Sequence, residues 1–102
     1  LELFVVAVSE PKLTFVPGAD EMMLQCEAEC WFPEPQVVFL DDQGSEIEAK
    51  RSQRDEDPTG CFTITRNVTL LATSSVTCKV HETHSNQTRM THLHIPGSCK
   101  SS

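Results

Sequence analysis

The sequence predicts an all-β fold in which two sheets pack face to face as a sandwich. Short runs that alternate apolar and polar residues with period two recur along the chain, and no long stretch has helical periodicity. Two cysteines, Cys26 and Cys78, stand on such runs and are 52 residues apart. With 102 residues, the chain is long enough for one core and too short for two.

The alternating runs are interpreted as seven strands, each separated from the next by residues that favour turns. Clusters of proline, glycine and aspartate at 17–20, 41–44, 58–60 and 96–97 predict the clearest turns. The fourth run is polar and weak, and a charged loop follows it. The first strand is predicted at Lys12–Val16 and the fourth at Glu46–Gln53. The other five are marked by residues that share one face: Met22, Leu24, Cys26 and Ala28 in the second; Val37 and Phe39 in the third; Phe62, Ile64, Val68 and Leu70 in the fifth; Val76, Cys78 and Val80 in the sixth; and Leu93 and Ile95 in the last.

Seven short strands in a chain of this length is the number found in constant-type immunoglobulin domains. Cys26 and Cys78 both face inward, on the second and sixth strands, which belong to opposite sheets of that sandwich. A disulfide between them is predicted to cross the core and to stabilise the fold by roughly 4 kcal/mol, because it closes a long loop. Phe39 stands where this sandwich usually places a core tryptophan.

Charge and cysteine content limit the classes of function. The net charge is −7 and the basic segment 50–54 adjoins an acidic run, which argues against nucleic acid as a partner. Five cysteines and two sequons, at Asn67 and Asn86, favour an oxidising compartment and N-glycosylation. The apolar segment 1–8 is too short to span a bilayer. Because the chain does not begin with methionine, we expect an excised part of a longer protein, with any membrane anchor outside this chain.

Metal binding and catalysis are the alternatives to a disulfide framework. A zinc site would draw its ligands from Cys26, Cys30, His81, His84, His92 and His94. The Cys-x-x-x-Cys spacing occurs once, Cys26 is assigned to the core bridge, and nothing marks an activated thiolate. We therefore expect no enzyme activity, no cofactor and no metal site.

The most specific motif is the block Cys26-x-x-x-x-Trp31-Phe32-Pro33-x-Pro35-x-Val37. With "SVTCKV" around Cys78 and "GCFTITRNVTL" before it, this block resembles the C-type immunoglobulin domain of the butyrophilin and butyrophilin-like family, relatives of the T-cell costimulatory ligands. The resemblance covers essentially the whole chain. The sequence departs from the family pattern at Cys30, at Cys61 and at Val76, which stands where other immunoglobulin domains have a tyrosine.

The resemblance implies a place and a function. Residues 1–8 correspond to the end of a preceding variable-type domain and its linker, 9–97 to the C-type domain, and 98–102 to a stalk. The family implies an ectodomain module on the extracellular side of the plasma membrane, within a single-pass membrane protein that regulates T-cell responses. In that protein a variable domain would bind a protein receptor on T cells, and this domain would support and space it. The alternative is an adhesion or receptor domain that itself binds a protein partner.

A second disulfide is predicted between Cys30 and Cys61. The second and fifth strands are antiparallel neighbours in an immunoglobulin sandwich, so the end of one lies beside the start of the other. Cys30 shares the inward parity of Cys26, whereas Cys61 has the opposite parity to the inward Phe62. The bridge therefore requires a bulge at the end of the second strand, just before Trp31.

Cys99 remains without a partner after these two bridges. It follows the last predicted strand and lies in the stalk, so we expect an intermolecular disulfide that joins two copies of the protein. A capped thiol, or a bridge to a cysteine outside this chain, is the alternative.

One sheet face is a candidate interaction surface. Partly apolar patches of this kind often mark interaction surfaces, whereas scattered hydrophobic side chains without a function are the alternative. The outward residues of this face are predicted to be Val38, Leu40, His81, Met90, His92 and His94. For His81, His92 and His94, three separate solvated side chains are favoured over a cluster that titrates together at about pH 6.5 or binds a metal. Asn67 is predicted on the opposite sheet, where a glycan would discourage contacts. Asn86 is predicted in the loop between the last two strands, facing the preceding domain.

Overall fold

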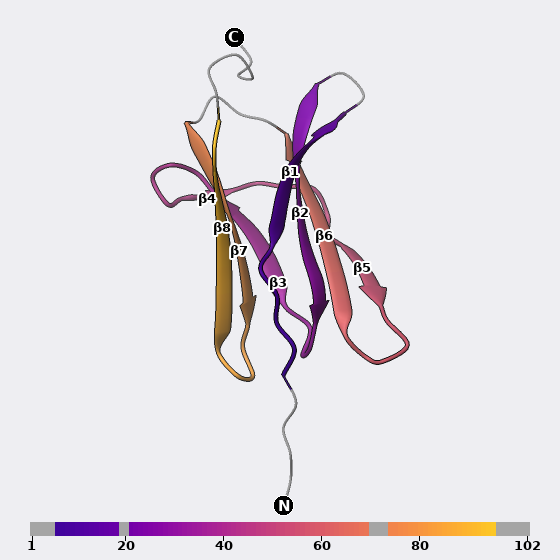
Figure 1. The fold of residues 1–102 in the computed structure, drawn as a ribbon. Helices are drawn as coiled ribbons and strands as arrows, with labels where there is room; N and C mark the ends of the chain where they lie inside the picture. The colour runs from indigo at the N-terminus through magenta and orange to yellow at the C-terminus, as the bar shows by residue number, and fades with distance from the viewer. Residues whose placement is uncertain (1–5, 19–20, 70–73, 96–102) are drawn as a thin grey trace, which may run out of the picture.

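The computed structural model describes residues 6–18, 21–69 and 74–95. In this part of the chain, eight strands form two antiparallel four-stranded sheets that face each other as a sandwich (Figure 1). One sheet has the order β1-β2-β6-β5 and the other β4-β3-β7-β8. Nowhere in these residues is there a helix long and apolar enough to cross a membrane. The strands are β1 (Lys12–Pro17), β2 (Met22–Trp31), β3 (Gln36–Leu40), β4 (Glu46–Ile47), β5 (Gln53–Glu56), β6 (Phe62–Thr69), β7 (Ser75–Glu82) and β8 (Gln87–His94).

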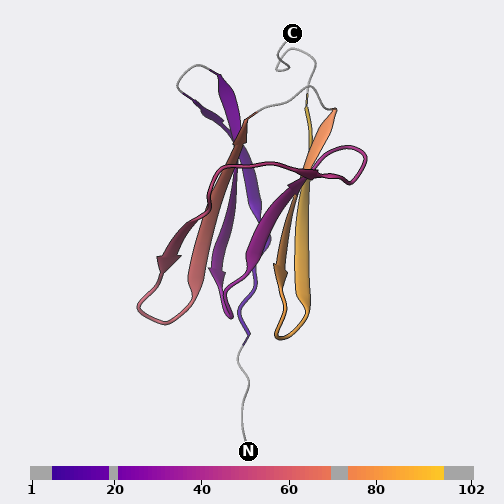
Figure 2. The same cartoon turned by 180° about the vertical axis from the view of Figure 1, so that it is seen from behind.

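The predicted all-β sandwich is confirmed, and the described residues form eight strands rather than seven. The polar run Glu46–Gln53, predicted as one strand, is divided: β4 ends at Ile47 and pairs with β3. The chain then crosses to the other sheet (Figure 2), where β5 pairs with β6. All four residues of β5 are polar and exposed, so hydrophobic alternation does not detect this strand. Such charged side chains suit an edge strand, because they discourage pairing with another chain.

The core fills the space between the sheets, where alternate residues of β2, β3, β6 and β7 point inward. Trp31 and Phe39 are the largest of the fully buried side chains. The predicted bridge joins Cys26 of β2 to Cys78 of β7, with Cα atoms 6.4 Å apart and both residues inaccessible to solvent. Phe39 is directly opposite Cys78 in the register of β3 and β7, so its ring lies beside the bridge.

The predicted bridge between Cys30 and Cys61 is also present, and so is the irregularity that it requires. Ala28 pairs with Ile64 and Trp31 pairs with Phe62, so β2 contains one residue more than β6 between these two pairs. Ala28 and Trp31 are both buried. Cys30 has a left-handed backbone with φ of 51°. This extra residue turns Cys30 away from the core and toward Cys61, with Cα atoms 4.8 Å apart, while Trp31 takes the inward position.

We expect the loss of the two disulfides to affect stability unequally. Replacing Cys30 and Cys61 by serine frees a loop of 31 residues and should lower the free energy of unfolding by roughly 3 to 4 kcal/mol, with the domain still folded. Replacing Cys26 and Cys78 by alanine frees 52 residues and opens a cavity in the core, so the loss should be larger. Urea unfolding followed by Trp31 fluorescence measures both. A smaller loss of stability for the Cys26 and Cys78 replacement than for the Cys30 and Cys61 replacement would contradict the expectation.

Candidate functional site

The outer face of the sheet β4-β3-β7-β8 carries the sequence-predicted interaction residues. They come from three adjacent strands and alternate with residues that point into the core: Val38, Leu40, His81, Met90, His92 and His94. In one row across the sheet, Val38 is opposite Lys79, and Lys79 is opposite Met90. Met90 is 56% exposed, more than the other exposed large hydrophobic side chains of the described residues. Lys79 separates the two apolar side chains, so this row is not a continuous apolar strip.

The histidines of this face are held by threonines on the neighbouring strand. Nδ1 of His92 lies 2.7 Å from Oγ1 of Thr77, and Nδ1 of His81 lies 2.6 Å from Oγ1 of Thr88. Each histidine is directly opposite its threonine in the register of β7 and β8. Thr88 and His92 are four residues apart on β8, about 13 Å along the strand, so His81 and His92 do not converge. Within the described ranges, no three His, Cys, Asp or Glu side chains are placed to hold a metal ion.

Residues 6–11, the N-terminal segment, are bonded to the end of β2. The backbone amide of Ala7 donates to the carbonyl oxygen of Phe32 at 2.9 Å, and the amide of Phe32 donates to the carbonyl oxygen of Ala7 at the same distance. Oγ of Ser9 donates to the carbonyl oxygen of Glu29 at 2.6 Å. Val8 packs against the core. These contacts tie the segment to the sheet that contains β2.

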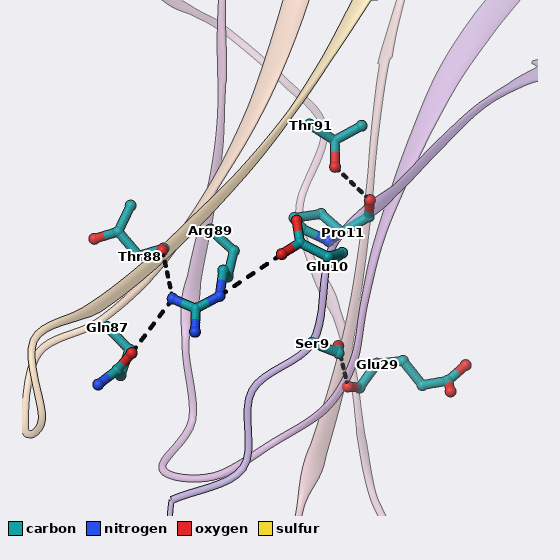
Figure 3. A network of polar contacts seen from close by, with 8 residues as sticks. All are labelled: Ser9, Glu10, Pro11, Glu29, Gln87, Thr88, Arg89 and Thr91. Carbon is teal, nitrogen blue, oxygen red and sulfur yellow. Dashed lines mark hydrogen bonds and ion pairs between the residues drawn. The ribbon is translucent and has the colours of Figure 1, made fainter.

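The same segment is also bonded to β8, in the other sheet (Figure 3). Oγ1 of Thr91 donates to the carbonyl oxygen of Pro11 at 2.6 Å. Nε of Arg89 lies 3.7 Å from a carboxylate oxygen of Glu10. Arg89 is oriented by further hydrogen bonds to the side chain of Gln87 and the carbonyl oxygen of Thr88. The N-terminal segment therefore joins the end of β2 in one sheet to the edge strand β8 of the other.

The turn between β7 and β8 is built around a buried carboxylate. Glu82 is almost completely buried and accepts hydrogen bonds from the amides of His84 and Ser85 and from the hydroxyl of Ser85. Burial by itself raises the pKa of Glu82, but the hydrogen bonds from Ser85 and His84 and the charge of His84 outweigh it, so the pKa is lowered. The sequence pattern did not single out Glu82, although a carboxylate at an inward position after Val80 is an unusual feature.

The two sequons lie on different parts of the sandwich. Asn86 is exposed, has a left-handed backbone with φ of 56°, and ends the turn between β7 and β8. This turn lies at the same end of the sandwich as residues 6–8 and the segment from β2 to β3 (Figure 1). Asn67 lies on β6, opposite Gln25, on the outer face of the other sheet. Asn67 thus lies on the predicted sheet face and Asn86 in the predicted turn, whereas the direction of a preceding domain stays a prediction.

Arg66 is a half-buried cation that the sequence pattern did not reveal. It occupies an inward position of β6 between Ile64 and Val68, where a hydrophobic residue is the norm. Its Nη1 donates to the carbonyl oxygen of Val37 at 2.6 Å, and its Nε donates to that of Lys50 at 2.8 Å. Arg66 thereby links β6 to β3 across the open side of the sandwich.

A cleft of about 790 Å³ opens beside Arg66, between β3 and the strands β5 and β6. Its wall includes an ion pair, in which Nε of Arg54 lies 2.9 Å from Oε1 of Glu34. The guanidinium of Arg54 also lies 4.7 Å from the centre of the Phe62 ring. The charged residues that line this cleft are three arginines and two glutamates, and one pair of them, Arg54 with Glu34, is in contact. Cys99 and the predicted stalk 98–102 lie outside the described residues.

A sandwich of two antiparallel sheets with a bridge between β2 and β7 is an immunoglobulin-like domain, a class found in many cell-surface proteins. The family model described as "Butyrophilin subfamily 3 member A2-like, Ig-C domain" matches residues 9–90. The chain belongs to this butyrophilin-type Ig-C domain family, as the sequence resemblance predicts.

Individual relatives agree with this assignment. The chain is 29% identical to human butyrophilin subfamily 1 member A1 over 93 residues, which cover 88% of this chain and 18% of that protein. It is 37% identical to human butyrophilin-like protein 2 over 70 residues, which cover 64% of this chain and 14% of that protein. The chain thus spans less than one fifth of these relatives.

Solved structures share the fold. The crystal structure of bovine butyrophilin matches with a TM-score of 0.79 and 26% identity, covering 89% of this chain and 44% of that chain. The ectodomain of mouse nectin-like molecule 4 matches with a TM-score of 0.72, covering 90% of this chain and 35% of that chain. At 16% identity, this second likeness concerns the fold alone.

Glu82 should make the stability of the domain depend on acid pH. A carboxyl group whose pKa is lowered by folding stabilises the domain above its ordinary pKa, and this contribution is lost as the pH falls through the lowered value. The Glu82→Gln variant should melt at a lower temperature than the wild type at pH 7 and show a smaller drop between pH 7 and pH 3. Thermal unfolding by circular dichroism measures this. Glu48→Gln, at an exposed position, is the matched control, and an unchanged pH dependence in Glu82→Gln would contradict the role of the buried carboxylate.

We expect both sequons to carry N-linked glycans in a mammalian host. Peptide-N-glycosidase should then reduce the mass of the wild-type protein by two glycans and the mass of the Asn86→Asp variant by one glycan. Aspartate is chosen because it tolerates the left-handed backbone of residue 86. Thr88→Ser, which keeps the sequon, is the control. An unchanged mass after treatment would refute the expectation for both asparagines.

Proposed function

We propose that this chain is a non-catalytic ectodomain module of a butyrophilin-like cell-surface protein that regulates T-cell responses. In this function it supports and spaces a variable-type domain, which binds a protein receptor on T cells. The proposal puts the module on the extracellular side of the plasma membrane, in a single-pass protein whose anchor lies outside this chain. Membership of the Ig-C family and the bovine butyrophilin fold support it, since immunoglobulin sandwiches of this kind are non-enzymatic.

The observation that carries the proposal is the attachment of residues 6–11 to both sheets. Paired backbone bonds at Ala7 and hydrogen bonds at Ser9 and Pro11 restrict this segment at several successive residues. A flexible linker would let a preceding domain sample many directions. A domain joined to a segment held in this way keeps a defined distance and direction, which is what a spacing module needs.

A second candidate function is direct binding through the exposed face of the sheet β4-β3-β7-β8. The observation that favours it is the exposure of Met90 at 56%, with Val38 and Leu40 on the same face. Exposed apolar side chains in a regular sheet often mark a contact surface. In this alternative, the domain would be an adhesion or receptor domain in its own right.

The two functions predict different binding behaviour. If the domain is a spacer, the complete ectodomain should stain T cells in flow cytometry, the isolated domain should not, and Met90→Glu in the complete ectodomain should change staining by less than about twofold. If the domain binds directly, the isolated domain should stain T cells and Met90→Glu should abolish staining. Thr14→Glu, an exposed position on the other sheet, is the matched charge control.

We further propose that Cys99 forms a disulfide between two copies of the full-length protein. Both bridges inside the domain are complete without Cys99, which leaves its thiol for an intermolecular bond. Non-reducing electrophoresis of the full-length protein from cells should give a dimer band that reducing agent removes. Cys99→Ser should abolish this band, and Cys30→Ser with Cys61→Ser should retain it. A dimer band that persists in Cys99→Ser would overturn the proposal.

A further inference from the structure

We propose that the innermost N-acetylglucosamine of a glycan on Asn67 packs into a small polar cleft beside it and holds the edge strand β5 against its sheet. The inference rests on glycosylation of Asn67, which the sequon predicts, and is independent of the T-cell function proposed above. It assigns a binding role to a cleft on the outer face of the sheet β1-β2-β6-β5, opposite the face that carries Met90.

The cleft is assembled from strands that are far apart in the sequence. It has a volume of about 110 Å³ and is lined by Gln25, Lys50, Arg51, Gln53, Thr65 and Asn67. Gln25 is opposite Asn67 in the register of β2 and β6, and Gln53 is opposite Thr65 in that of β5 and β6. The amide of Lys50 donates to the carbonyl oxygen of Asn67 at 3.0 Å. The segment before β5 is therefore fixed next to the glycosylated residue.

The side chain of Asn67 lines this cleft, and its amide oxygen accepts no hydrogen bond. Oδ1 of Asn67 is buried and has no hydrogen-bond partner, while the residue as a whole keeps partial exposure. A buried polar atom without a partner is unusual in a folded protein and calls for an explanation. Nδ2 of the same amide, to which a sugar would be bonded, is not among the buried atoms without a partner, so the sugar would start from the accessible side of this side chain and extend over the cleft.

The lining matches the chemistry of a single sugar. Two amides, one hydroxyl, one ammonium and one guanidinium surround Asn67, and these groups donate to or accept from sugar hydroxyls and an acetamido group. With a volume of about 110 Å³, the cleft can hold part of one sugar and not a longer oligosaccharide. Asn86 provides the contrast within the chain, because it is exposed in a turn and lines neither this cleft nor the larger one beside Arg66.

The proposed contact acts on the weakest part of the sheet. β5 has four exposed polar residues, contributes no side chain to the core, and is hydrogen-bonded on one side, to β6. Segments with few buried contacts open most readily. A sugar that touches Gln53 and Lys50 while covalently bound to Asn67 connects the start of β5 to β6, and should slow this opening.

The test separates the first sugar from the rest of the glycan. The complete ectodomain is secreted from mammalian cells that make high-mannose glycans, and occupancy of Asn67 is measured by peptide mass spectrometry. Endoglycosidase H then leaves one N-acetylglucosamine on each asparagine. Peptide-N-glycosidase F, applied to the intact form, removes the whole glycan and hydrolyses the side-chain amide, so residue 67 becomes an aspartate beside Lys50 and Arg51. The Thr69→Val variant therefore supplies the sugar-free form that keeps Asn67. Hydrogen exchange of amides 50–56 should be the same in the intact and the one-sugar forms, and about fivefold faster after complete removal. Exchange in β3, which lies in the opposite sheet and carries no sequon, should not change.

Variants assign the effect to Asn67 and to the cleft. Asn86→Asp, with the Asn67 glycan alone, should retain the full difference between the one-sugar and sugar-free forms. Thr69→Val removes the Asn67 sequon but keeps the asparagine and the branched side chain, so it is a sugar-free form without a new carboxylate. Its amides 50–56 should exchange about fivefold faster than those of the one-sugar form. Gln53→Ala should reduce the difference, because it removes one wall of the cleft.

Two results would overturn the inference in distinguishable ways. An unoccupied Asn67 would remove the sugar itself and refute the glycosylation prediction as well. An occupied Asn67 whose one-sugar and sugar-free forms exchange equally in 50–56 would refute the packing of the sugar while leaving the glycosylation intact. Neither result bears on the T-cell function, whose test uses the opposite sheet and the complete ectodomain.

Discussion

The bridge between Cys26 and Cys78 is the constraint on which the arrangement of the two sheets depends. β2 and β7 are inner strands, each with a neighbour on both sides, so a bond between them fixes the two sheets to each other at their centres. The sheets of such a sandwich are about 10 Å apart, and the side chains around the bridge fill that space. Trp31 and Phe39 are the two largest of the fully buried side chains in this core.

Further disulfide and hydrogen bonds, which add to the Cys26–Cys78 bridge, are concentrated near the C-terminal end of β2. The Cys30–Cys61 bridge joins β2 to the residue before β6, and Ala7 pairs with Phe32 just beyond β2. Thr91 extends the same set of bonds to the other sheet through the carbonyl oxygen of Pro11. The domain is thus reinforced where the chain leads into β1, as the proposed spacing function requires.

The two outer faces of the sandwich differ in chemistry, and this difference separates the candidate functions. One face carries Asn67 and a polar cleft on which a glycan can rest. The other carries Met90, Lys79 and histidines bonded to threonines, with no sequon among its described residues. Because bulky sugars obstruct protein contact, the second face is the one available to a partner. Its cationic and imidazole groups contrast with the net charge of −7 of the whole chain.

The sequence by itself determined the all-β sandwich, the core bridge, the family and even the bulge at Cys30, because alternation, cysteine parity and motif spacing are local patterns. It did not determine β5, whose residues 53–56 have no apolar member and become a strand only by pairing with β6. Nor did it reveal Arg66 or Glu82, which occupy inward positions that only nearby carbonyl and amide groups make tolerable. The attachment of residues 6–11 was equally hidden, since Thr91 and Pro11 are 80 residues apart. Bonds between such distant residues depend on how the sheets are packed, and that packing exists only in the folded chain.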